Sequence, residues 1–80
     1  VTRPPNYPGA PIAYDGARQL VVMFNNADQT WTWDGSNWTQ RNPVNRPGGR
    51  SNARMAYDPV REEIVLFGGD SRSDTWTWDG

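Results

Sequence analysis

Residues 63–69, Glu63-Ile64-Val65-Leu66-Phe67-Gly68-Gly69, and residues 74–80, Asp74-Thr75-Trp76-Thr77-Trp78-Asp79-Gly80, decide the fold. The first stretch is an apolar run rich in β-branched and aromatic residues, which predicts a buried strand. Its terminal glycines predict a turn in which Gly68 or Gly69 has a positive φ. The second stretch alternates Thr and Trp, so both Trp side chains share one face of a strand and both Thr side chains the other.

The same pattern occurs earlier, so the chain contains one unit twice. Leu20–Phe24 takes the place of the apolar run, and Thr30–Gly35 takes the place of the Thr/Trp stretch. Tyr14-Asp15 recurs 43 residues later at Tyr57-Asp58, whereas Asp-Gly at 34–35 recurs 45 residues later. The two extra residues fall in a polar stretch, which marks that stretch as a loop. A repeat of this length with several strands per unit is typical of propeller blades or stacked arrays.

Each unit is expected to form one antiparallel sheet. The first unit, residues 1–43, opens with a loop at 1–9, and its strands are expected at 10–14, 19–24, 30–33 and from 38 onward. The second unit, residues 44–80, has expected strands at 53–57, 63–67 and 75–78 but no counterpart of residues 36–43, so its outer strand is missing. The continuous apolar runs predict burial on both faces of the central strands.

Two turns carry further expectations. Asp15-Gly16 is a hairpin turn, because Asp-Gly readily supplies a positive φ. Asn25-Asn26 stands where the second unit has its glycine pair, and Asn tolerates the same left-handed conformation. The Asn pair therefore weakens the repeated pattern without contradicting it.

Composition excludes several classes of function. The chain has no Cys and no His, which removes disulfides, thiolate metal sites and the usual acid–base group at neutral pH. A net charge of −1 argues against a nucleic-acid partner. No apolar run reaches the roughly 20 residues of a membrane helix, so no membrane partner is expected. The chain does not begin with Met, and we expect a processed, excised or engineered segment.

The apolar run closed by Gly-Gly, followed by spaced aromatic residues, resembles the kelch repeat, and 56–59 with 63–69 is similar to bacterial kelch-like proteins in particular. The resemblance implies an all-β fold of β-propeller blades, one four-stranded and one lacking its outer strand. Two departures are the Asn pair at 25–26 and the absence of a closing Trp in the second unit. The structural positions that the resemblance marks are Trp31, Trp33, Trp38, Phe67, Gly68, Gly69, Trp76 and Trp78.

Charged residues of the expected loops are the candidates for binding. A propeller would gather on one rim the arginines Arg3, Arg46, Arg50, Arg54 and Arg72. Such a rim could hold carboxylate or phosphate groups through bidentate pairing, and the alternative is surface ion pairs or cation–π contacts. The spacing of Asp28, Asp70 and Asp74 is poor for calcium and favours turn-forming and capping roles. Residues 71–76 resemble the Asp-box of sialidase-type propellers but lack its glycine.

The resemblance implies a binding platform rather than an enzyme. One hypothesis is a structural segment that self-associates into a closed ring, with three copies favoured over four. The other is part of a larger secreted bacterial propeller that binds carbohydrate or protein through its rim loops. A galactose-oxidase type of enzyme would need copper-binding Tyr, His and Cys chemistry, and this chain has no His or Cys. No catalytic residue, metal or cofactor is expected.

Overall fold

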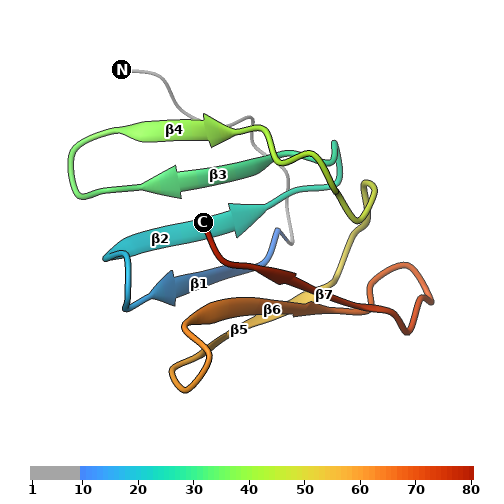
Figure 1. Cartoon of the computed structure of the whole chain (residues 1–80). Coiled ribbons are helices and arrows are strands. Elements are labelled where there is room, and N and C mark those ends of the chain that lie inside the picture. Colours follow the sequence, from blue (N-terminus) through green and yellow to red (C-terminus); the bar gives the residue numbers. More distant parts are fainter. Residues whose placement is uncertain (1–9) are drawn as a thin grey trace.

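The computed structural model describes residues 10–80, which form an all-β structure of two antiparallel sheets (Figure 1). The first sheet has the order β1-β2-β3-β4, with strands Ile12–Asp15, Leu20–Phe24, Thr30–Trp33 and Trp38–Arg41. The second has the order β5-β6-β7, with strands Arg54–Asp58, Glu63–Phe67 and Thr75–Trp78. Each strand predicted within this range is present, and none of the described residues forms a helix that could cross a membrane. The expected opening loop, with Arg3, lies outside the described residues.

The first hairpin of each sheet is built alike. Asp15 Oδ1 accepts hydrogen bonds from the amides of residues 17 and 18, and Asp58 Oδ1 accepts them from the amides of residues 60 and 61. The left-handed residue is Gln19 in one hairpin (φ 58°) and Glu62 in the other (φ 56°). The expectation that Gly16 supplies the positive φ is therefore wrong, because the aspartate side chain forms the turn and the left-handed step comes just before the next strand.

The corner after the central strand differs between the units. Gly68 and Gly69 have φ values of 73° and 92°, which confirms the predicted positive φ. Asn25 and Asn26 are not left-handed, so the left-handed conformation that Asn tolerates is not used at this corner. The side chain of Asn25 makes the turn instead: its Oδ1 accepts hydrogen bonds from the amides of Ala27 and Gln29.

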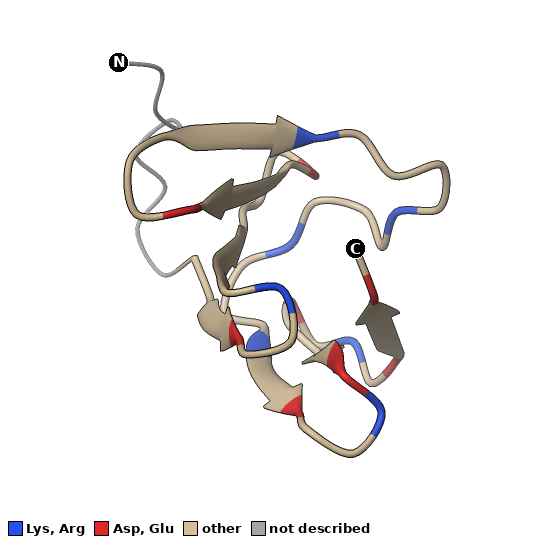
Figure 2. Ribbon diagram, turned by 60° about the vertical axis from the view of Figure 1, so that its left-hand side comes forward, with Lys and Arg blue, Asp and Glu red and all other residues tan. Residues whose placement is uncertain are grey.

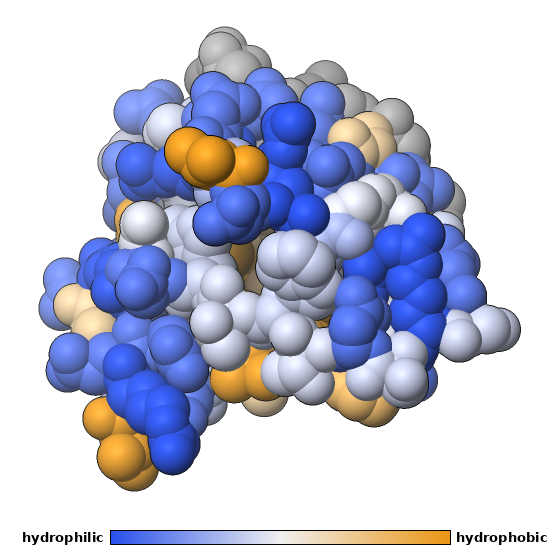
Figure 3. All heavy atoms as spheres, turned by 45° about the vertical axis from the view of Figure 1, so that its right-hand side comes forward, coloured by the Kyte–Doolittle hydropathy of each residue, from blue (hydrophilic) through white to orange (hydrophobic). Residues whose placement is uncertain are grey.

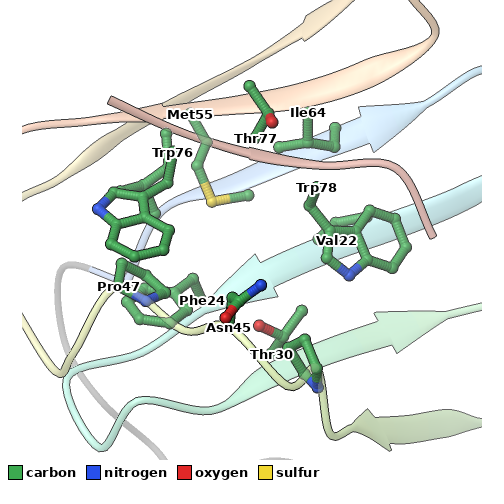
Figure 4. Close-up of a pocket in the computed structure, with 12 residues that line it drawn as sticks. Val22, Phe24, Thr30, Asn45, Pro47, Met55, Ile64, Trp76, Thr77 and Trp78 are labelled. Carbon is green, nitrogen blue, oxygen red and sulfur yellow. The ribbon is translucent and has the colours of Figure 1, made fainter. Parts of the chain in front are cut away.

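The core lies between the two sheets. Val22 and Phe24 of β2 are 2% and 3% exposed, and they face Ile64 and Leu66 of β6. The close-up in Figure 4 shows Trp76 and Trp78 of β7 on the same side of the second sheet, turned toward the first. Burial on both faces of the apolar runs is not observed, since Phe67 at the end of β6 is 51% exposed. The second sheet thus buries one face and leaves the other open. The far face of the first sheet is open at Ile12 and Tyr14 but closed at Trp31, which is 5% exposed.

Candidate interaction surface

Arg50 is the most deeply placed of the candidate arginines, with 2% of its surface exposed. All five of its N–H donors have acceptors inside the chain. Nε donates to the carbonyl of Gly48, Nη1 to Gly68 O (3.1 Å) and Asp74 Oδ1 (2.6 Å), and Nη2 to Pro47 O and Asp74 Oδ2 (3.1 Å). The prediction of a rim-binding Arg50 is wrong for this reason: the guanidinium holds the loop at 47–50 against the corner of the second sheet.

Asp74 connects this arginine to the strand that follows. Its Oδ2 also accepts a hydrogen bond from the indole N–H of Trp76 at 2.7 Å. The Arg50 guanidinium, and after it the Trp76 indole, hold the pKa of the Asp74 carboxyl well below its usual value. The first unit repeats the motif with a neutral residue, since Gln29 Oε1 accepts from Trp31 Nε1 at 3.1 Å. An acceptor two residues before the first Trp of each pair was the sequence signal for this contact.

The remaining candidate arginines have looser contacts. Arg46, with its side chain 51% exposed, lies 3.6 Å from Asp28, and Arg72 donates to Pro47 O at 3.4 Å. Arg54, grouped with the loop arginines although it falls within the strand expected at 53–57, is the first residue of β5 and lies opposite Phe67. Figure 2 shows acidic and basic residues interspersed among the described loops and strand ends. The loop that contains Pro47 therefore brings Arg46, Arg50 and Arg72 together, and Arg54 stands apart.

The three aspartates considered for calcium, Asp28, Asp70 and Asp74, all have partners within the protein. Asp28 Oδ1 accepts from the amide of Gly48 at 3.0 Å, and Asp70 Oδ2 accepts from the amide of Ser51 at 3.0 Å. Within residues 10–80 no group of three or more acidic side chains is arranged to hold a metal ion. The side of the molecule on which these loops lie is predominantly hydrophilic, with isolated hydrophobic side chains (Figure 3).

The open faces of the two sheets differ in chemistry. Directly opposite residues in neighbouring antiparallel strands point to the same face, so the strand register assigns each side chain. The other face of the first sheet, here called the head face, carries Ile12, Tyr14, Val21, Met23, Trp31, Trp33, Trp38 and Gln40, of which Trp31 is only 5% exposed. The open face of the second sheet, here called the tail face, carries Arg54, Ala56, Asp58, Glu63, Val65, Phe67, Thr75 and Thr77.

The repeat relates the open faces to the buried ones. Phe67 and Thr75 of the tail face correspond to Phe24 and Thr30, which the second sheet covers. Met23 of the head face corresponds to Leu66, which packs against Phe24. Between the covered faces lies a cavity of about 50 Å³, too small for more than a solvent-sized guest. The larger surfaces for a partner are therefore the two open faces.

A clasp joins the ends of the two sheets beside this cavity. Arg18, in the first hairpin, donates from Nη1 to Asp15 Oδ2 and to Glu62 O, both at 2.9 Å. Its guanidinium carbon lies 5.8 Å from the centre of the Trp78 ring. The sequence analysis missed this arginine, although Arg-Asp pairs at the same place in both units were a signal for it.

Comparison of the chain with protein-family models, with curated proteins and with solved structures finds no match. The case for function therefore depends on the geometry of the chain itself.

Proposed function

We propose that this chain is a non-enzymatic pair of kelch-like propeller blades that associates with further copies of itself into a closed ring and serves as a structural scaffold. The observation that carries the proposal is the unequal exposure of one repeated side chain. Phe24 is 3% exposed beneath the second sheet, whereas its counterpart Phe67 is 51% exposed on the tail face. Each sheet thus has a face that carries this phenylalanine, and only the face of the first sheet is covered by another sheet.

The complementary surface is also present twice. Ile64 and Leu66, which cover the first sheet, are 2% and 6% exposed. On the head face, Ile12 and Tyr14 of β1 are 57% and 55% exposed, whereas Trp31 of β3 is 5% exposed. The exposed apolar part of the head face therefore lies along β1, and it favours a partner there. The head face of one copy has the chemistry needed to cover the tail face of another.

Ring closure follows from the type of contact. A head-to-tail contact is heterologous, and its repetition gives a closed ring when the rotation between units is suitable. Because propellers have about four to eight blades, three copies would complete a ring, and we favour three over four. The open edge of β7, which has no second neighbour among the described strands, gives such a ring a further place for pairing.

The test is the mass of the assembly in solution. Native mass spectrometry and sedimentation across micromolar concentrations should give a concentration-dependent oligomer for the unchanged chain. Phe67→Glu should yield a folded monomer, because the charge lies on the covered face. Val44→Glu is the matched control, since Val44 is 96% exposed outside both faces, and it should leave assembly unchanged. A folded monomer of the unchanged chain at every concentration would refute the proposal.

A second function is favoured by one observation on the loops. The side chain of Arg46 is half exposed and has a partner only at 3.6 Å within the described residues, and Arg72 lies nearby through Pro47. The pair could hold a carboxylate of a carbohydrate or protein ligand, as a larger secreted propeller would. Binding to a glycan array that disappears in Arg46→Ala and Arg72→Ala would support this alternative, and the absence of binding would remove it.

A further inference from the structure

We propose that neighbouring copies are held in register by a second clasp, in which Arg61 of one copy lies over the indole of Trp33 of the next and donates to the carbonyl of its Gln19. This inference rests on the proposed self-association. It specifies which side chains fix the rotation between copies.

The template is the clasp inside the chain. Arg18 is anchored on its own hairpin by Asp15 and reaches across to the second sheet, where it meets the Glu62 carbonyl and the Trp78 ring. These contacts combine a charge-assisted hydrogen bond with a cation–π contact. They lie at the hairpin end of the two sheets, away from the loop that contains Arg50. They therefore set how the sheet ends lie relative to each other.

The donor half of the clasp is repeated in the second unit. Arg61 stands 43 residues after Arg18 and pairs with Asp58 at 3.2 Å, as Arg18 pairs with Asp15 at 2.9 Å. The side chain of Arg18 is 31% exposed, whereas that of Arg61 is 71% exposed. The second arginine is thus held on the same kind of turn but has no sheet above it in the described structure.

The acceptor half is repeated in the first unit. Gln19 corresponds to Glu62 and has nearly the same left-handed backbone, so its carbonyl follows the same path at the start of the strand. Trp33 corresponds to Trp78 and lies on the head face, where it packs against Trp38 with ring centres 5.6 Å apart. This packing holds the indole in place before a partner arrives. Donor and acceptor halves therefore lie on the two faces that the proposed assembly brings together.

The first experiment is a double-mutant cycle on the dissociation constant of the assembly, measured by sedimentation. Arg61→Gln should weaken association about tenfold, a change typical of a cation–π contact with a hydrogen bond. Trp33→Leu should weaken association as well. The double variant should raise the dissociation constant by a factor smaller than the product of the two single factors. Arg61→Lys, which keeps the charge, should recover part of the loss. Val44→Gln is the control and should change nothing, since Val44 is 96% exposed outside both faces.

A crosslink tests the register without relying on Trp33, whose replacement could disturb its own sheet. Inside the chain, a Cβ at Gly16 would lie 3.5 Å from the Tyr57 ring. By the repeat, Pro59 of one copy takes the place of Gly16, and Tyr14 of the next copy takes the place of Tyr57. The chain has no cysteine, so chains with Pro59→Cys and chains with Tyr14→Cys can be mixed and joined by a short bis-maleimide. Joined pairs are expected from the mixture and not from a Val44→Cys mixture.

The outcomes separate the two proposals. If the unchanged chain stays monomeric, self-association itself fails, and the clasp fails with it. If the unchanged chain assembles but Arg61→Gln behaves like Val44→Gln, self-association stands and the clasp is overturned. Assembly with no crosslink between positions 59 and 14 also overturns the clasp, because the copies then meet in another register.

Discussion

Replacement of Arg50 by Met is the sharpest test of how this fold is held together. Met keeps most of the length of the buried stem but removes all five donors. The carbonyls of Pro47, Gly48 and Gly68 then lose their partner, and Gly68 is itself buried. An unsatisfied buried polar group costs about 1–3 kcal/mol, whereas the Asp74 carboxylate, whose side chain is 44% exposed, remains solvated without its partner. We expect Arg50→Met to lower the free energy of unfolding by about 1–3 kcal/mol.

A loss of this size is large for a small domain, whose whole stability is about 0.05–0.15 kcal/mol per residue. Urea denaturation followed by tryptophan fluorescence measures it directly. Arg46→Met is the matched control, because Arg46 is half exposed, and it should change stability by less than about 0.5 kcal/mol. Equal midpoints for the Arg50 and Arg46 variants would refute the reasoning. Adding Asp74→Leu to Arg50→Met should not restore stability, since the three backbone carbonyls would still lack donors.

Two more predictions concern the same region. A Cβ at Gly49 would clash with the carbonyl oxygen of Asn26, whereas a Cβ at Gly16 would make an ordinary contact at 3.5 Å. Gly49→Ala should therefore lower the melting temperature far more than Gly16→Ala, as thermal melting of the two variants would show. Hydrogen bonds from Arg50 lower the pKa of Asp74, so the ionised carboxylate stabilises the fold above the unfolded value of 3.8, and this stability is lost as pH falls through the folded value. Urea midpoints between pH 7 and 2 should fall less steeply in Asp74→Asn, and an unchanged profile would contradict this.

The strands and their order could be predicted because they depend on local pattern. The apolar run at 63–67 and the Thr/Trp alternation at 75–78 specify strands whatever surrounds them. The left-handed Gly68 and Gly69 were likewise predictable, since the requirement lies in the glycines themselves. The turn formed by the Asn25 side chain could not be predicted. In the first unit side-chain hydrogen bonds form the corner, whereas in the second unit left-handed glycines form it.

The contacts of Arg50 could not be predicted from periodicity. Its partner Asp74 lies 24 residues further along, in a loop whose length differs between the units. The corresponding position of the first unit is Tyr7, so the repeat itself gives no sign of a buried arginine. Arginines in polar loops are usually exposed, and that general rule placed Arg50 on a rim. Only the folded loops bring five acceptors around one guanidinium.

The structure also separates what folds the chain from what would assemble it. Arg50 joins loops within the second unit, whereas Phe67 and Arg61 lie where a neighbouring copy would sit. The sheets of one chain are joined by a short linker, so their contact benefits from a high effective concentration that separate copies lack. The same faces would therefore hold firmly within a chain and only reversibly between chains. Dilution should dissociate the proposed ring and leave each pair of sheets folded. Assembly that depends on concentration while the secondary structure stays constant would therefore distinguish the proposed association from folding coupled to assembly.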